Sequence, residues 1–188
     1  MTIQHRTITD PQIHEPKGVA AAASGEVYVA NGAGSGAWAA GISGQQVQIG
    51  YATSGTQIQA STTIPLDDTI PQNTEGTELI TLAFTPKSAS STLIIEGFCF
   101  YSSTQTGTLA LFVDSTADAL AATAADAGSN TATDISVKHS VASGSTSART
   151  YKLRLGTSGG AEWEVNGVNG SQVFGGTACL VLKVTEVL

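Results

Sequence analysis

Residues 10–38 constrain this chain more than any other segment, because they cannot fold around a core of their own. Their sequence is Asp-Pro-Gln-Ile-His-Glu-Pro-Lys-Gly-Val-Ala-Ala-Ala-Ala-Ser-Gly-Glu-Val-Tyr-Val-Ala-Asn-Gly-Ala-Gly-Ser-Gly-Ala-Trp. Pro, Gly, Ala and Ser predominate, and such small residues bury too little apolar surface to offset the entropy lost on ordering. We therefore expect this segment to be ordered by attachment to something larger.

Local signals within this segment predict extended backbone followed by a hairpin. Pro11 and Pro16 favour extended conformations in the residues that precede them. Glu26–Ala30 is a short predicted strand, and Asn31–Gly32 is a turn signal.

The chain carries no Asp, Glu, Lys or Arg from Val27 to Leu66. Within this stretch, residues 46–50 and 55–60 alternate apolar and polar side chains, as strands with one buried face do. Identical copies could pair here without opposing like charges, so residues 42–63 are interpreted as a neck or trimerisation region. The alternative is that the stretch packs only on its own domain.

Residues 64–188 are predicted to form the folded domain, an all-β, jelly-roll-like β-sandwich of about eight strands. Leu93–Tyr101 is apolar on both faces and is expected to be a central strand. Other segments alternate, as in Ile135, Val137, His139 and Val141, and two Asn-Gly pairs after Val165 indicate tight turns. No helical period extends far enough to cover a sheet.

Composition excludes several classes of function. The net charge of −7 argues against binding nucleic acid or anionic lipid. No stretch is apolar enough to predict a membrane helix, and the first residues lack the apolar run of a signal peptide. Cys99 and Cys179 lie in apolar runs and are expected to be reduced core thiols, with a bridge between facing strands as the alternative.

The sequence offers no catalytic or metal site, and no cofactor is expected. His139 on an apolar face is better explained as a core or interface residue than as a catalytic base. His5 and His14 lack metal-ligand spacing, and Asp67–Asp68 favours turn chemistry over calcium binding. The glycines at 32, 34 and 36 are not followed by a predicted helix, as a phosphate loop would require.

Trp163 stands beside two tight-turn signals, which include Asn166 and Asn169. We predict that it lies at a loop tip, where these three residues form a possible receptor-contact loop that stacks a sugar on the aromatic ring. The alternative is a half-buried Trp163 at a subunit contact.

Two stretches resemble structural proteins of tailed bacteriophages. Residues 10–18 with residues 25–38 resemble the N-terminal segment of head-fibre, decoration or tail-fibre proteins. Residues 64–76, Ile-Pro-Leu-Asp-Asp-Thr-Ile-Pro-Gln-Asn-Thr-Glu-Gly, with residues 84–88 resemble the start of a β-domain of phage fibres and spikes. The resemblance implies a homotrimer with a jelly-roll head and an N-terminal segment that docks on the particle.

These observations lead to the hypothesis of a non-enzymatic virion protein, made in the host bacterial cytoplasm. Residues 1–41 would dock on the major capsid protein or another virion protein, as capsid decoration, cement or head fibre. The alternative is a tail-fibre-like adhesin that binds a receptor or a host-surface glycan. The candidate docking residues are Ile13, His14, Glu15, Pro16, Lys17, Tyr28 and Trp38, among which large apolar side chains are the natural anchors.

Overall fold

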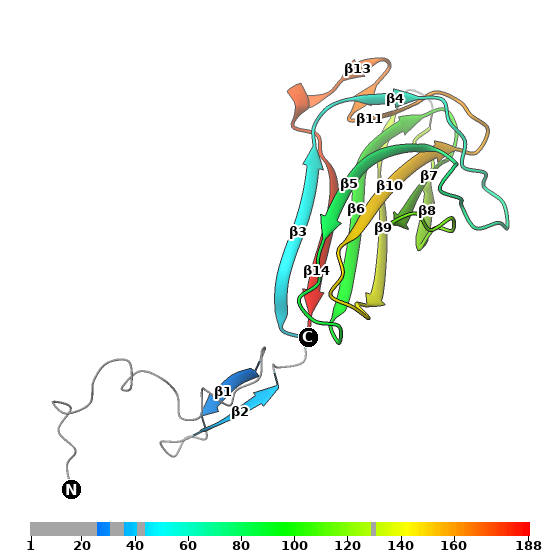
Figure 1. The fold of residues 1–188 in the computed structure, drawn as a ribbon. Helices are drawn as coiled ribbons and strands as arrows, with labels where there is room; N and C mark the ends of the chain where they lie inside the picture. The colour runs from blue at the N-terminus through cyan, green and yellow to red at the C-terminus, as the bar shows by residue number, and fades with distance from the viewer. Residues whose placement is uncertain (1–25, 31–35, 41–43, 129–130) are drawn as a thin grey trace, which may run out of the picture. The chain divides into compact units, whose positions relative to one another are not determined.

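The computed structural model describes residues 26–30, 36–40, 44–128 and 131–188. The chain divides into two compact units, residues 1–45 and residues 46–188. Figure 1 shows strands joined by loops, and no α-helix occurs among the described residues. The predicted all-β fold is confirmed.

The described strands of the first unit form one antiparallel hairpin. Strands β1 (Glu26–Ala30) and β2 (Gly36–Ala40) pair along their whole length. The predicted strand at 26–30 is therefore confirmed. The predicted turn at Asn31–Gly32 and the segment around Pro11 and Pro16 lie outside the described residues.

The second unit is built on a six-stranded antiparallel sheet whose central strand is β6 (Thr92–Ser103). One edge of β6 pairs with β9 along almost its full length, and the other pairs first with β14 and then with β11. Beyond these, β3 pairs with β14 and β4 with β11. The remaining strands are β3 (Gln46–Ser54), β4 (Ile58–Ala60), β9 (Ala132–Ala142), β11 (Trp163–Val165) and β14 (Leu180–Val187). The predicted central strand at 93–101 is confirmed.

A four-stranded antiparallel sheet packs against the first in the order β5-β10-β7-β8. Its strands are β5 (Thr77–Phe84), β7 (Gly107–Val113), β8 (Ala121–Ala125) and β10 (Arg149–Thr157). A small hairpin of β12 (Gly167–Val168) and β13 (Ser171–Gln172) follows β11. Asn169 and Gly170 connect these strands with φ values of 52° and 76°, so the predicted Asn-Gly turn is confirmed.

The core lies between the inner faces of the two sheets. Gly97 shows how closely they approach, because a Cβ atom at this position would lie 2.5 Å from a methyl carbon of Leu153 on the opposite sheet. The largest fully buried side chains include Tyr101, Tyr151, Leu109, Leu111, Leu155, Leu180 and Trp163. All of these side chains belong to residues 46–188.

Two predictions differ from the structure. Within residues 42–63, interpreted as a neck or trimerisation region, β3 and β4 are strands of the domain's main sheet, while the trimerisation role stays a prediction. Their alternating pattern was recognised, but alternation does not reveal which strand they pair with. Cys99 is the expected buried thiol, whereas Cys179 is exposed, and both are free. Burial raises the pKa of the Cys99 thiol, and the charge of Asp134 adds to this.

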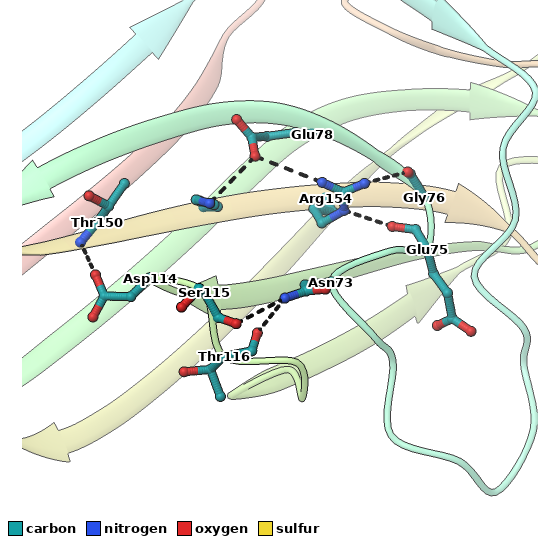
Figure 2. A network of polar contacts seen from close by, with 10 residues as sticks. Asn73, Glu75, Gly76, Glu78, Asp114, Ser115, Thr116, Thr150 and Arg154 are labelled. Atoms are coloured by element: carbon teal, nitrogen blue, oxygen red, sulfur yellow. Dashed lines mark hydrogen bonds and ion pairs between the residues drawn. The ribbon is translucent and has the colours of Figure 1, made fainter.

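The segment at residues 61–76, called the strap, crosses the outer face of the four-stranded sheet. Ile64 is fully buried there beside Phe112 of β7. Arg154 of β10 fixes the end of the strap, since its Nε donates to the carbonyl of Glu75 at 2.7 Å and its Nη2 to that of Gly76 at 2.8 Å (Figure 2). The phage-like motif at 64–76 is thus a covering segment of the domain.

A buried carboxylate joins three segments at the end of the sandwich where β3 begins. Glu186 of β14 is fully buried. It accepts hydrogen bonds from the backbone N–H groups of Lys87 and Ser88 at 2.9 Å, from Ser91 Oγ at 2.6 Å and from Gln48 Nε2 at 2.8 Å. Burial raises the pKa of Glu186, but these donors lower it more, so the pKa lies below its usual range.

Substitution Glu186→Gln should destabilise the protein by about 1.5–3 kcal/mol at pH 7, because hydrogen bonds to a charged acceptor are lost. Since the folded pKa is lowered, the carboxylate contributes stability above its unfolded pKa of about 4.3 and loses this contribution as the pH falls through the folded value. Urea unfolding at pH 7 and below pH 4 should show the variant losing less stability on acidification than the unsubstituted protein.

The matched control is Glu162→Gln, at an exposed carboxylate without a partner among the described residues, which should change stability by less than about 0.5 kcal/mol. Equal effects of the two substitutions would contradict the role assigned to Glu186.

Candidate interaction surfaces

The hairpin of the first unit places two candidate docking residues side by side. Tyr28 and Trp38 are directly opposite in the β1–β2 register. Their rings meet edge to face, with centroids 5.4 Å apart and an interplanar angle of 67°. Both side chains are half-buried and Val29 is 49% exposed. An isolated two-stranded hairpin is only marginally stable in water, so a partner surface would stabilise this one.

The other candidate docking residues lie outside the described residues. These are Ile13, His14, Glu15, Pro16 and Lys17, and His5 lies there as well. Their role stays a prediction.

The outward surface of the six-stranded sheet is unusually apolar along β3. Successive outward side chains of this strand are Val47, Ile49 and Tyr51, which are 37%, 45% and 69% exposed. Across β14 and β6, Thr185 and Ile94 lie in register with Ile49, Lys183 and Glu96 with Tyr51, and Val181 and Phe98 with Thr53. We call this surface the outer face. It continues to an open sheet edge, because among the described strands β3 pairs only with β14.

The charges at the centre of the outer face form an ion-paired cluster of one glutamate and two lysines, with one positive charge in excess. Glu96 of β6 lies between Lys183 of β14 and Lys138 of β9, with an N–O distance of 3.0 Å to each lysine. The hydrogen bond from Lys183, followed by that from Lys138, lowers the pKa of Glu96 below its usual range. This part of the outer face therefore presents paired charges beside exposed apolar side chains.

The residues predicted to form a receptor-contact loop are divided between core and surface. Trp163 of β11 is only 1% exposed and does not lie at a loop tip, so its ring offers no exposed surface on which a sugar could stack. Asn166 is also buried, and its Nδ2 donates to the carbonyls of Ser54 at 2.9 Å and Thr56 at 3.2 Å. Asn169, at the turn between β12 and β13, is exposed.

The Asn-Gly signals correctly identified a turn. They did not predict that Asn166, whose φ is 59°, would be buried and would donate hydrogen bonds to the carbonyls of Ser54 and Thr56. Local sequence contains no signal for such long-range hydrogen bonds.

A polar cavity of about 150 Å³ lies where the end of β6 meets β11 and the β12–β13 turn. Trp163 and Glu164 line it from β11, and Asn169 and Thr104 line it from loops. Glu164 is buried, and its two carboxylate oxygens accept from the Gly170 N–H at 2.5 Å and from Gln57 Nε2 at 3.0 Å. The sequence did not predict that residues of β6, β11 and the adjoining loops would line one cavity.

The remaining candidate groups are not gathered into a reactive site. His139 lies on the inward side of β9 opposite Ile95, half-buried. Within the described ranges, no three His, Cys, Asp or Glu side chains are grouped as metal ligands. No helix in the described part of the chain is long and apolar enough to cross a membrane.

The comparisons with known proteins find weak similarities to solved structures and no match to a family model or a curated protein. No model of a known protein family matches the sequence, and no curated protein matches it. Similar solved structures include infectious bursal disease virus Gx strain, at a TM-score of 0.34 and 15% identity. The VP2 subviral particle of infectious bursal disease virus is another, at a TM-score of 0.30 and 11% identity. In both cases the similarity covers 85% of this chain and 41% of the matched chain.

Proposed function

We propose that this chain is a non-enzymatic structural protein of a tailed-phage virion, attached to the particle through residues 1–41. The observation that carries the proposal is that the buried core side chains among the described residues all belong to residues 46–188, which form a compact unit of their own. The described part of the N-terminal unit is a single hairpin with an aromatic pair. A segment of this kind gains its stability from a partner.

The proposed partner is the major capsid protein or another virion structural protein. Support comes from the resemblance of residues 10–18 with residues 25–38 to the N-terminal segments of phage head-fibre, decoration or tail-fibre proteins. Extended, proline-containing chain loses less entropy when it docks. Tyr28 and Trp38 supply large apolar contact area, and the residues from Ile13 to Lys17 complete the proposed contact.

The proposed assembly is a homotrimer in which copies of this chain cover one another's outer face. Exposed apolar patches beside open strand edges are typical of interaction sites. The proposed occupant is a second copy, because β3 lies within the uncharged stretch 27–66 and Glu96 offsets one of the two lysine charges at the centre of the outer face. Three linked N-terminal segments would bind a particle far more tightly than one.

A receptor-binding adhesin is the second candidate function. The observation that favours it is the polar cavity beside Asn169, which opens among loops at one end of the domain. Adsorption to host cells by the purified protein, in competition with phage, separates this function from particle attachment.

Deletion of residues 1–41 should leave a folded β-domain that no longer binds particles lacking this chain, because the sandwich core lies beyond the deletion. Circular dichroism and thermal unfolding check the fold, and co-sedimentation with the particles checks attachment. Retained co-sedimentation of the truncated protein would rule out the proposed docking segment.

Substitution Ile49→Lys should reduce the oligomer to monomer, because three charges would be brought together in an apolar contact. The matched control Thr146→Lys adds the same charge at an exposed loop residue between β9 and β10 and should leave the oligomer intact. Sedimentation velocity gives the masses. An unchanged mass for Ile49→Lys, or a monomeric unsubstituted protein, would exclude the outer face as the subunit contact.

A further inference from the structure

A strongly exposed aromatic side chain follows the β12–β13 hairpin in a strained backbone conformation. Phe174 begins a short 3₁₀ turn (Phe174–Gly176), is 69% exposed and has a φ of 52°. This left-handed region is costly for a bulky residue, and such strain persists mostly where the residue has a function. Gly175 and Gly176 also have positive φ values, but glycine adopts them without strain.

Hydrogen bonds hold the Phe174 loop in this conformation. The Thr177 N–H donates to the Phe174 carbonyl at 3.1 Å, and Thr177 Oγ1 donates to the same carbonyl at 2.8 Å. On the other side of the loop, Gln172 Nε2 donates to the carbonyl of Gly55 at 3.2 Å. A ring presented by a fixed loop loses little conformational entropy when a partner contacts it.

The ring of Phe174 lies on the outer face. It meets the ring of Phe100 edge to face, with centroids 5.8 Å apart and an interplanar angle of 65°. Phe100 is half-buried and points outward from β6, because its neighbours Cys99 and Tyr101 are fully buried on the inward side. Phe174 therefore adds a second strongly exposed aromatic side chain to the outer face, in addition to Tyr51.

The surface around Phe174 has little charge to oppose an identical copy. Residues 165–182 contain no Asp, Glu, Lys or Arg, and the same is true of residues 27–66. On β6, β9 and β14 the outward charges are two carboxylates and two lysines, which sum to zero: Glu96, Asp134, Lys138 and Lys183. Like charges brought together across a contact cost free energy. This surface is therefore suited to a copy of itself, although the whole chain has a net charge of −7.

We propose that Phe174 is the anchor residue of the contact between copies of this chain, where its ring packs against the outer face of a neighbouring subunit. This inference rests on the proposed homotrimer and assigns its main contact to a residue outside β3. Anchors of protein contacts are enriched in aromatic residues, and their truncation costs far more than that of the residues around them. The strained φ directs the ring outward, and the assembly covers the ring.

Substitution Phe174→Ala should weaken each subunit contact about thirtyfold, the loss expected when an aromatic anchor is truncated. Sedimentation velocity of the full-length protein over a dilution series measures the association. Leu66→Ala, at a side chain of the strap that is 59% exposed, is the matched control. It should leave the association unchanged.

Substitution Phe174→Gly separates the contact from the fold. Glycine adopts a positive φ without strain, whereas alanine retains the strain. At concentrations where both variants are monomeric, the glycine variant should therefore unfold about 2–4 °C above the alanine variant. Both lack the ring and should associate equally weakly. A residue that served only the fold would give parallel changes in melting temperature and association.

Three results would overturn the inference: a monomeric unsubstituted protein, unchanged association of Phe174→Ala, or equal loss of association in Leu66→Ala. Failure of the proposed assembly is distinguishable from failure of the inference. Dissociation by Ile49→Lys with intact association of Phe174→Ala would retain the outer-face trimer and reject Phe174 as its anchor. Intact association of Phe174→Ala with lost adsorption to host cells would assign this side chain to the receptor function and reject the subunit contact.

Discussion

The packing of the two inner sheet faces against each other is the interaction on which the rest of this structure depends. β6 and β14 contribute one face, with Ile95 and Leu182 fully buried, and β7 and β10 contribute the other, with Leu111 and Leu153. The absence of a side chain at Gly97 allows Leu153 to pack directly against β6. The buried side chains of this core among the described residues all belong to residues 46–188.

The edge strand β3 connects these proposed roles. It follows the N-terminal unit, extends the main sheet and presents Val47, Ile49 and Tyr51 outward. The carboxylate of Glu186 binds Gln48 at its beginning, and Asn166 binds the carbonyl of Ser54 at its end. Buried polar groups thus fix both ends of a strand whose outward side is apolar.

Alternation and turn chemistry predicted much of the fold from the sequence. The central position of β6 followed from its two apolar faces, and the Asn169–Gly170 turn followed from a dipeptide preference. Pairing partners could not be predicted in this way, so β3 was assigned to a neck when it in fact belongs to the main sheet. The site was less predictable still. Trp163 was expected at a loop tip, but its position is set by pairing with β4 and β6, and such long-range contacts leave no local pattern.

Cryo-electron microscopy of the intact virion tests the central claim most directly, because it images the N-terminal unit and the β-domain in the same particle. The predicted result is density for residues 1–41 against a virion structural protein, with the β-domains projecting and the outer faces of three copies in contact. Density in which the β-domain itself contacts the particle while the N-terminal unit points outward would contradict the claim.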